Sequence, residues 1–354
     1  MKKICVVLFA ILLIFIENDH DITSYAMTET WEEVQGIFVD EPTYVLSRNG
    51  MGTFCSVYAY LSKDVTIDIT ADAEYVSSNE AVVSVHSGVI RAEGKGTAVV
   101  TVLYHGFTTS FNVTVEKEVD LDRLEKEFLQ RSGVEVADNA VYQRTIRDIF
   151  SSETRTIHAR SSQDILDKAV AMKNIEWTPT QTLYGWKKEF SFPKGVLVTG
   201  IPYSQANQAD DIEFIKVLKY SDFYSGGESP NGDYCPKYGV DCSRYVSYAM
   251  GITAQTTATM VSNLKNGTGD IEKVGSYNVS SPNQVDLLAA YRLTDEGNGL
   301  VHRYNGENHA MLVVYNDKNA EEITVYETQI KTPFMTTYSY STLAKKRYLP
   351  FKIK

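Results

Sequence analysis

Alternating apolar and polar positions mark the chain from residue 37 to residue 115. Short runs of this kind are separated by turn residues, and the clearest cover residues 57–60, 65–70, 81–86, 98–104 and 107–115. A period of two is typical of strands that bury one face, and close spacing of such runs favours a small antiparallel sandwich. We therefore predict a small all-β domain over residues 37–116.

The periodicity becomes helical and the composition more charged over residues 117–156. One apolar face is formed by Leu121, Leu124, Phe128 and Leu129, and Gly133 is the expected end of that helix. A second short helix is expected around residues 141–150. This segment predicts a helical linker whose charged side chains are solvated.

A third helix is expected after Ser161 or Ser162, with an inward face made by Ile165, Leu166, Ala169 and Met172. Aromatic residues and Gly/Pro turns then become frequent. Further helices are expected around residues 259–264 and 285–291, followed by strands. Residues 157–354 therefore predict one compact α+β domain.

Cys242 follows the turn at residues 238–241 and precedes an apolar stripe of helical spacing, which is made by Tyr245, Val246 and Ala249. A cysteine in the first turn of a helix lies beside unpaired amides and the positive end of the helix dipole, which favour a thiolate. Cys242 is therefore a candidate nucleophile. The alternative is a buried structural cysteine.

Two later runs supply partners for this thiol. Residues 309–315 are apolar on both faces, which fits a central strand with His309 at its start. Residues 323–329 alternate, so Glu327 shares a face with two apolar side chains. A carboxylate there is costly unless it is paired, and an imidazole on the neighbouring strand is a suitable partner.

These positions predict a Cys–His–Glu triad. Cys242 attacks, His309 takes and returns the proton, and Glu327 fixes the tautomer and orientation of the ring. The residues leave alternatives open. His302 is a rival base, Gln329 is a rival orienting residue with Glu327 then an exposed charge, and His309 alone could be a satisfied core histidine.

The first residues carry two lysines followed by thirteen apolar residues, too few to span a bilayer. Ser24-Tyr25-Ala26 offers a small-x-small cleavage site. We expect a secretory signal peptide over residues 1–26, the alternative being an uncleaved anchor. No later stretch is long and apolar enough to cross a membrane, so the mature chain is expected to be secreted and extracellular or associated with the cell wall.

Removal of residues 1–26 leaves Cys55, Cys235 and Cys242, so at least one thiol stays free. Cys55 and Cys235 are expected to be either paired or merely buried. The net charge of -11 leaves no basic surface for nucleic acid. His86 and His105 lack companions at metal-ligand spacing and are expected to be ordinary strand or loop residues.

Residues 75–102 resemble the bacterial immunoglobulin-like domain, group two. The matching positions are Ser77, Ser78, Asn79, Val83, Val85, Gly88, Val89, Gly94, Gly96 and Thr97. The resemblance implies an immunoglobulin-like module that spaces or attaches a partner domain.

The second half resembles the NlpC-type cell-wall peptidases and their CHAP amidase relatives, which share a papain-like α+β fold. The resemblance is carried by residues 200–204, 238–243, 308–313, 325–329 and 348–351. It implies that Cys242 is the nucleophile, His309 the base and Glu327 the polar third member. It further implies an oxyanion held by the backbone N–H of Cys242 and the hydroxyl of Tyr203, and it implies no metal or organic cofactor.

The chain departs from this family pattern in three places. Tyr203 precedes Cys242 by thirty-nine residues, so an insertion at residues 204–237 must loop out, and another alignment puts Phe223 in the place of the tyrosine. Arg244 stands where the family usually has glycine. The Gly-Asp pair common before the histidine strand is not evident.

The sequence thus predicts an exported multidomain cysteine hydrolase. By resemblance, its substrate is the peptide part of peptidoglycan, cut by endopeptidase or amidase action through a thioester. One alternative is an acyltransferase or deamidase that uses the same triad. The other is a non-catalytic surface adhesin or wall-binding protein with a degenerate cysteine domain.

Overall fold

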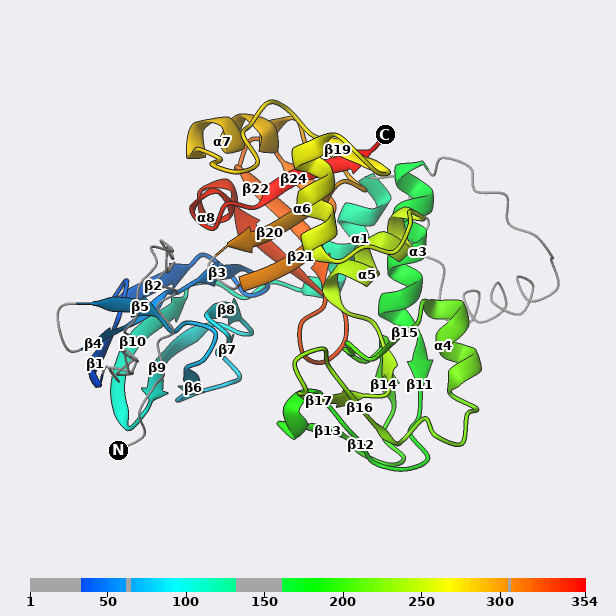
Figure 1. The fold of residues 1–354 in the computed structure, drawn as a ribbon, viewed down its shortest axis with the longest axis horizontal. Helices are drawn as coiled ribbons and strands as arrows, with labels where there is room; N and C mark the ends of the chain where they lie inside the picture. Colours follow the sequence, from blue (N-terminus) through cyan, green and yellow to red (C-terminus); the bar gives the residue numbers. More distant parts are fainter. Residues whose placement is uncertain (1–32, 62–64, 132–160, 305–306) are drawn as a thin grey trace, which may run out of the picture. The chain divides into compact units, whose positions relative to one another are not determined.

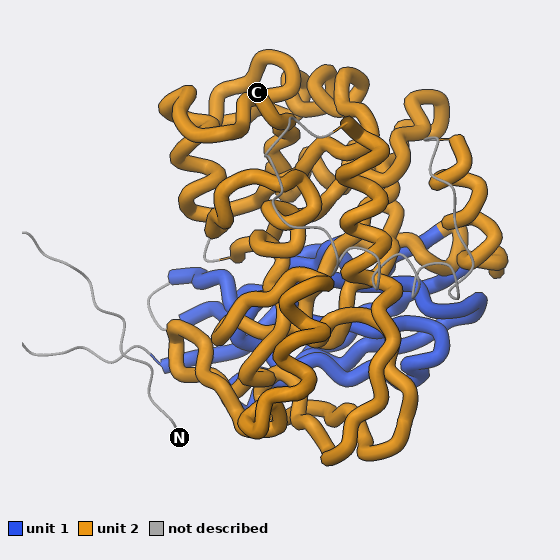
Figure 2. The backbone as a smooth tube through the Cα atoms, turned by 90° about the vertical axis from the view of Figure 1, so that its right-hand side faces the viewer, with its two compact units in different colours: residues 1–46, 54–116 blue, residues 47–53, 117–354 orange. Residues whose placement is uncertain are grey.

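The computed structural model describes residues 33–61, 65–131, 161–304 and 307–354 (Figure 1). These residues form two compact units (Figure 2). The first unit extends to Leu46 and resumes over Phe54–Glu116, and the second comprises Ser47–Thr53 and Lys117–Lys354. The expected signal peptide and the expected second linker helix lie outside the described residues.

The first unit is built from strands. A three-stranded sheet has the order β1-β4-β5, a four-stranded sheet has the order β2-β10-β9-β6, and β7 and β8 form an antiparallel pair. The bounds are β1 Val34–Val39, β2 Thr43–Leu46, β3 Gly52–Phe54, β4 Val57–Leu61, β5 Thr66–Asp68, β6 Glu74–Ser77, β7 Val83–His86, β8 Val89–Ala92, β9 Gly96–Tyr104 and β10 Phe107–Val115.

The period-two pattern explains these strands, because alternate residues are buried along them. The core includes Val57, Ala59, Val100, Val102, Phe111 and Val113. The predicted strand at 107–115 is found with these bounds. The predicted antiparallel arrangement needs one correction, since β2 pairs with β10 in parallel. On its other side β10 pairs with β9 in the antiparallel direction, so β10 has one parallel and one antiparallel neighbour.

Buried Thr70 links β4 to the end of β5 by hydrogen bonds. The hydroxyl of Thr70 accepts from the Val57 amide at 2.8 Å and donates to the Asp68 carboxylate at 2.6 Å. The hydroxyl of Tyr75 donates to the Thr70 carbonyl at 2.8 Å. The buried hydroxyl and carbonyl of Thr70 therefore both have hydrogen-bond partners, as burial requires.

The second unit is organised around a six-stranded antiparallel sheet of order β19-β24-β20-β21-β22-β23. β21 is fully buried over residues 310–314, as expected for a run that is apolar on both faces. The bounds are β19 Ile271–Lys273, β20 Gly299–Tyr304, β21 Glu307–Asp317, β22 Glu322–Glu327, β23 Phe334–Ser339 and β24 Leu349–Ile353.

Helices pack against this sheet and against one another. Ser161 caps one of them, α3, and forms a capping box with Asp164, and the four predicted inward residues of α3 are all buried. α5 and α6 pack on β21 and β20, and α3 packs on α5. The bounds are α1 Leu121–Arg131, α3 Ser162–Asn174, α4 Asp211–Val217, α5 Cys242–Met250, α6 Thr257–Asn266, α7 Gln284–Arg292 and α8 Tyr340–Lys345.

α1 is part of the second unit and is not a solvated linker helix. Phe128 stacks on Tyr315 of β21 with ring centroids 4.5 Å apart. Glu125 is paired with Lys173 at 3.1 Å and also accepts from the hydroxyl of Tyr326. The charges on this face of the helix are therefore used in packing, which the sequence pattern did not indicate.

The predicted insertion contributes folded elements to the second unit. It contains α4, β15 Asn207–Gln208, β16 Gly226–Glu228 and β17 Tyr234–Pro236. Four short strands precede it and one follows it, namely β11 Glu176–Trp177, β12 Leu183–Tyr184, β13 Ser191–Phe192, β14 Val198–Thr199 and β18 Tyr238–Gly239, together with the 3-10 helix η1 Trp186–Lys188.

No disulfide joins Cys55, Cys235 and Cys242 in the described part of the chain, and the first two are fully buried. The possible Cys55–Cys235 disulfide is therefore not formed. Within residues 33–61, 65–131, 161–304 and 307–354, no helix has the length and apolar character needed to cross a membrane.

Gly239 permits the close approach of two backbone segments. A Cβ atom at this position would lie 2.1 Å from the carbonyl oxygen of Pro202, which itself accepts from the Val240 amide at 3.0 Å. We predict that Gly239→Ala lowers the free energy of unfolding of the second unit by about 1–3 kcal/mol because the segments must separate. Urea unfolding followed by tryptophan fluorescence reports this, since Trp177 and Trp186 lie in that unit.

The same variant should also slow alkylation of Cys242, which follows directly on this segment. Gly267→Ala is the matched control. Gly267 has a φ of 66° and no atom within 4 Å of an added Cβ, so this change strains only the end of α6. Equal losses of Cys242 reactivity in the two variants would show that the approach at Gly239 does not shape the site.

Candidate active site

Cys242 is the first residue of α5, as predicted, and is half-buried. Asp241 caps the helix, and its Oδ1 accepts from the Arg244 amide and from the Ser243 hydroxyl, both at 2.8 Å. The hydroxyl of Tyr245 donates to the Ala169 carbonyl at 2.9 Å and fixes α5 against α3. The thiol is therefore held at a rigid helix start.

His309 is brought to this thiol by the packing of α5 on β21. Its Nε2 lies 2.7 Å from Oε2 of Glu327, so the other ring nitrogen is left to face Cys242. Burial alone would lower the pKa of His309, but hydrogen bonds to Cys242 and to Glu327, together with the charges of these groups, raise it to about 10. Its contacts with Cys242 and Glu327 thus stabilise the imidazole as a cation.

Glu327 is fully buried at the end of β22 and shares a face with Ile323 and Val325, as the alternation predicted. Its Oε1 accepts from the Tyr338 hydroxyl at 2.8 Å, and its Oε2 accepts from Gln329 at 3.3 Å. Burial would raise the pKa of Glu327, but His309 above all, together with the Tyr338 hydroxyl, lowers it. The carboxylate therefore stays charged without access to water.

Tyr203 lies near enough to Cys242 for the two groups to interact electrostatically, although thirty-eight residues separate them in the sequence. Backbone pairing closes the gap, because the Val240 amide donates to the Pro202 carbonyl and the Ala209 amide to the Gly239 carbonyl at 2.7 Å. Burial raises the pKa of Tyr203 well above its usual value, and the charge of Cys242 raises it further. The Tyr203 hydroxyl thus stays protonated and can donate a hydrogen bond.

Three residues that sequence reasoning missed hold this arrangement. Gln208 joins the two backbone segments, since its Oε1 accepts from the Asp241 amide and its Nε2 donates to the Ser204 carbonyl, both at 2.9 Å. Gln205 donates to the Tyr203 hydroxyl at 2.6 Å. The third is Tyr338, on Glu327. The two glutamines lie close to Tyr203 in the sequence, and this proximity could have identified them. No sequence pattern identifies Tyr338.

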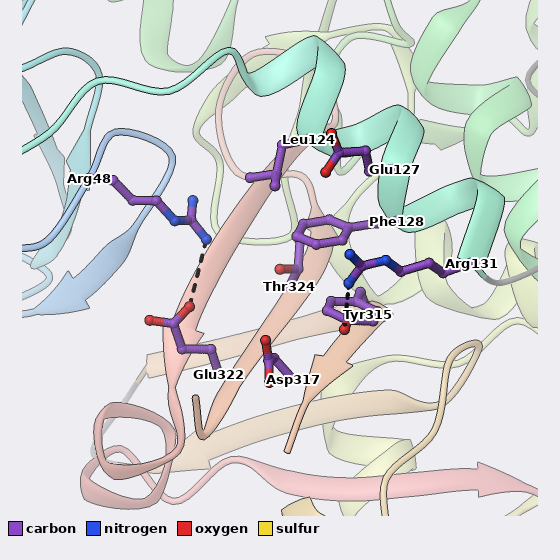
Figure 3. Close-up of a pocket in the computed structure, with 9 residues that line it drawn as sticks. All are labelled: Arg48, Leu124, Glu127, Phe128, Arg131, Tyr315, Asp317, Glu322 and Thr324. Carbon is purple, nitrogen blue, oxygen red and sulfur yellow. Dashed lines mark hydrogen bonds and ion pairs between the residues drawn. The ribbon is translucent and has the colours of Figure 1, made fainter. Parts of the chain in front are cut away.

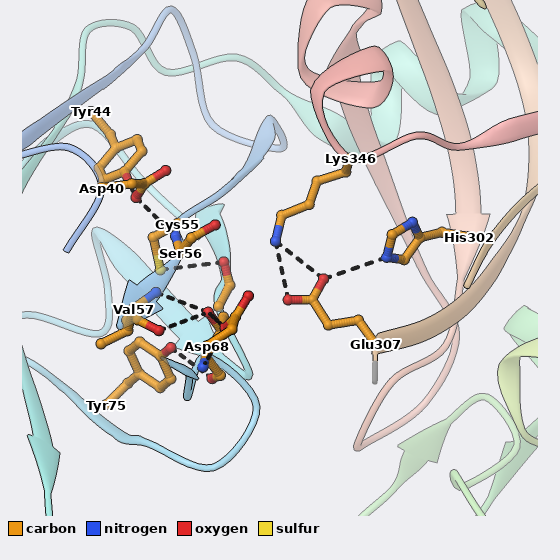
Figure 4. Close-up of polar contacts among 12 residues, drawn as sticks. Asp40, Tyr44, Cys55, Ser56, Val57, Asp68, Tyr75, His302, Glu307 and Lys346 are labelled. Atoms are coloured by element: carbon orange, nitrogen blue, oxygen red, sulfur yellow. Dashed lines mark hydrogen bonds and ion pairs between the residues drawn. The ribbon is translucent and has the colours of Figure 1, made fainter. Parts of the chain in front are cut away.

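The rival residues take other positions. Phe223 is buried in an aromatic cluster with Trp177 and Phe214. Gln329 supports Glu327 and is not the partner of His309. His302 is buried and lies 3.5 Å from Glu307 (Figure 4). Among the described residues, Cys242, His309, Glu327 and Tyr203 are the predicted site residues that come together.

A separate cavity of about 260 Å³ lies between α1 and the far ends of β21 and β22 (Figure 3). Arg131 lies over the Tyr315 ring and donates to its hydroxyl at 2.9 Å, and Arg48 is 3.7 Å from Glu322. The lining residues include none of the predicted site residues, so this cavity is distinct from the cysteine site. In the described ranges, no group of three or more His, Cys, Asp or Glu side chains could hold a metal ion.

No protein-family model matches this chain, and none of the curated proteins matches it. Among solved structures, domains 4 and 5 of the S-layer protein SbsC match with 13% identity over 24% of this chain and 54% of that chain, at a TM-score of 0.22. An intimin mutant of EHEC O157:H7 matches with 12% identity over 32% of this chain and 67% of that chain, at a TM-score of 0.16. These scores are too low to transfer a fold or a function.

The geometry supplies the parts of a nucleophilic site. A thiol at a helix start contacts an imidazole whose far nitrogen is held by a buried carboxylate, and the charge of the thiol acts on a nearby phenol. Such a set can form and break a thioester, with the phenol and the Cys242 amide available to an oxyanion.

We predict that Glu327→Gln lowers the pKa of His309 by about one to three units, because the variant removes the opposing charge and keeps the shape. A pH titration of the His309 ring by NMR measures this. Tyr338→Phe is the control, since it removes a hydrogen bond to Glu327 but no charge, and it should shift the pKa less. An unchanged His309 titration in Glu327→Gln would contradict the assigned pairing.

Proposed function

We propose that this protein is an exported cysteine hydrolase that cleaves amide bonds in the peptide part of peptidoglycan. The observation that carries the proposal is the contact of His309 with both Cys242 and the buried Glu327 carboxylate. In this proposal the second unit is a papain-like domain of the NlpC and CHAP type. The first unit is a bacterial immunoglobulin-like domain that spaces or attaches it at the cell surface.

The proposed reaction begins when the Cys242 sulfur attacks the carbonyl carbon of the scissile amide. The negative charge that develops on the carbonyl oxygen is stabilised by the Cys242 backbone N–H and by the Tyr203 hydroxyl. His309, charged in the resting site, donates its proton to the leaving amine, and a thioester remains. Glu327 holds the ring in place throughout.

Water then attacks the thioester, and His309 accepts its proton as the sulfur leaves. The product acid departs and the thiolate and imidazolium are restored. Each step needs the imidazole to alternate between acid and base, which its position between the thiol and Glu327 permits. Water as the acceptor distinguishes this hydrolysis from acyl transfer by the same residues.

The first test is digestion of purified sacculi by the full chain, with mass spectrometry of the soluble products. We predict that the wild type releases peptide fragments with one new amine and one new carboxylate, and that Cys242→Ala releases none, because it lacks the nucleophile. Cys55→Ala is the control, since this buried thiol lies in the other unit, and it should keep activity.

Equal digestion by Cys242→Ala would overturn the proposal. Products that carry an added amine in place of the new carboxylate would indicate an acyltransferase. Binding of the wild type to sacculi without any product would favour a non-catalytic wall-binding protein.

A second prediction concerns Tyr203. Tyr203→Phe should lower kcat by about 10²-fold or more, because it removes one hydrogen-bond donor to the oxyanion. The rate of Cys242 alkylation should stay near that of the wild type, since the thiol and His309 are untouched. Steady-state kinetics on a muropeptide and alkylation by iodoacetamide measure the two quantities. A kcat equal to that of the wild type would remove Tyr203 from the oxyanion site.

A further inference from the structure

The hydroxyl of Tyr203 accepts one hydrogen bond and donates none to the described residues. Tyr203 is only 8% exposed, so this O–H group is largely removed from water. Its oxygen accepts from Nε2 of Gln205 at 2.6 Å, and no described residue accepts its proton. A buried donor without an acceptor needs an explanation.

The rest of Tyr203 is held by contacts that do not involve this proton. Its backbone amide donates to the Lys331 carbonyl at 2.6 Å. Its ring meets the Trp186 ring edge to face, with centroids 5.2 Å apart, and both rings pack with Cys235 in one buried cluster. The ring is therefore positioned without Gln205. What Gln205 adds is the direction of hydrogen bonding at the hydroxyl.

That direction decides where the phenol proton can go. A phenol oxygen that accepts from an amide N–H must direct its own O–H away from that amide. Burial raises the pKa of Tyr203 well above its usual value, the charge of Cys242 raises it further, and the hydrogen bond from Gln205 acts in the opposite direction. A donor that draws charge from the phenol oxygen makes the O–H a stronger donor in turn.

We propose that Gln205 is a positioning residue that acts through Tyr203: its amide donates to the phenol oxygen and so keeps the phenol proton available to the oxyanion that forms when Cys242 attacks an acyl group. This inference rests on the proposed role of Tyr203 in hydrolysis. It explains why the buried hydroxyl has a donor on one side and no acceptor on the other.

Two variants of Gln205 separate this role from a structural one. Gln205→Glu keeps the shape of the side chain, but a carboxylate can only accept, so it takes the Tyr203 proton away from the oxyanion. Gln205→Met removes the N–H donor and offers no acceptor, so the proton stays available. We therefore expect the larger loss in Gln205→Glu. A structural role would give the reverse order, because glutamate is the closer match to glutamine.

The experiment is the acylation of Cys242 by p-nitrophenyl acetate in the full chain. The sulfur forms a thioester with the acetyl carbon and p-nitrophenolate leaves, so absorbance gives the rate and peptide mapping identifies the acylated residue. We expect the rate constant to fall by about 10²-fold in Gln205→Glu, as for a lost oxyanion donor, and by about 2- to 10-fold in Gln205→Met. Alkylation of Cys242 by iodoacetamide forms no oxyanion and should change much less.

The negative charge of Gln205→Glu needs its own control. Both substitutions are therefore repeated in the Tyr203→Phe background, where there is no phenol proton to redirect, and each should cost little more there. A loss that persists in full without the phenol would show that position 205 acts on Cys242 directly. Asn207→Asp is the matched control, since it makes the same change of amide to carboxylate on a nearby exposed side chain, and it should acylate like the wild type.

A wild-type acylation rate in Gln205→Glu, or a larger loss in Gln205→Met, would overturn the proposal. So would a loss that is unchanged in the Tyr203→Phe background, or a wild type whose Cys242 is not acylated. If Gln205→Glu does not fold, Gln205→Met decides, because its loss must vanish in Tyr203→Phe. The ester contains no peptide, so a failure of the proposed peptidoglycan cleavage is seen separately, as absent digestion of sacculi with this order of acylation rates retained.

Discussion

The geometry of the candidate site depends on one buried charge. Glu327 is fully enclosed, and a carboxylate without water is tolerated only where hydrogen bonds and an opposite charge replace its hydration. Tyr338 and Gln329 supply hydrogen bonds, and His309 supplies the charge. This requirement holds the imidazole in one orientation, with a single ring nitrogen left for Cys242. The orientation of His309 thus follows from the free-energy cost of burying the Glu327 carboxylate.

The rest of the second unit keeps the thiol in reach of that imidazole. α5 is fixed by the Asp241 cap at its start and by the Tyr245–Ala169 hydrogen bond along its length. Tyr203 belongs to a segment that precedes Cys242 by many residues. The two segments can lie against each other because Gly239 has no side chain where it meets the Pro202 carbonyl. The insertion between them folds into its own short elements and leaves this approach intact. Backbone pairing, and not closeness in sequence, therefore places Tyr203 near Cys242.

Local patterns predicted much of this structure. The capping of α3, the buried stripe of α5 and the inward direction of Glu327 all follow from periodicity and cap chemistry within one element. Patterns of this kind could not show which elements meet. The contacts of Glu125 with Lys173 and Tyr326, the Tyr338–Glu327 hydrogen bond and the bridge made by Gln208 join segments that are far apart or on different strands. The parallel pairing of β2 with β10 is a long-range choice of the same type.

We infer that Cys242 and His309 form a thiolate–imidazolium pair in the resting protein. The most direct measurement is the ultraviolet absorbance of thiolate at neutral pH, taken as the difference between the wild type and Cys242→Ser and repeated in the His309→Ala background. The account predicts a thiolate signal in the wild type that disappears without His309. A wild type that shows no thiolate, or a signal that persists without His309, would contradict it.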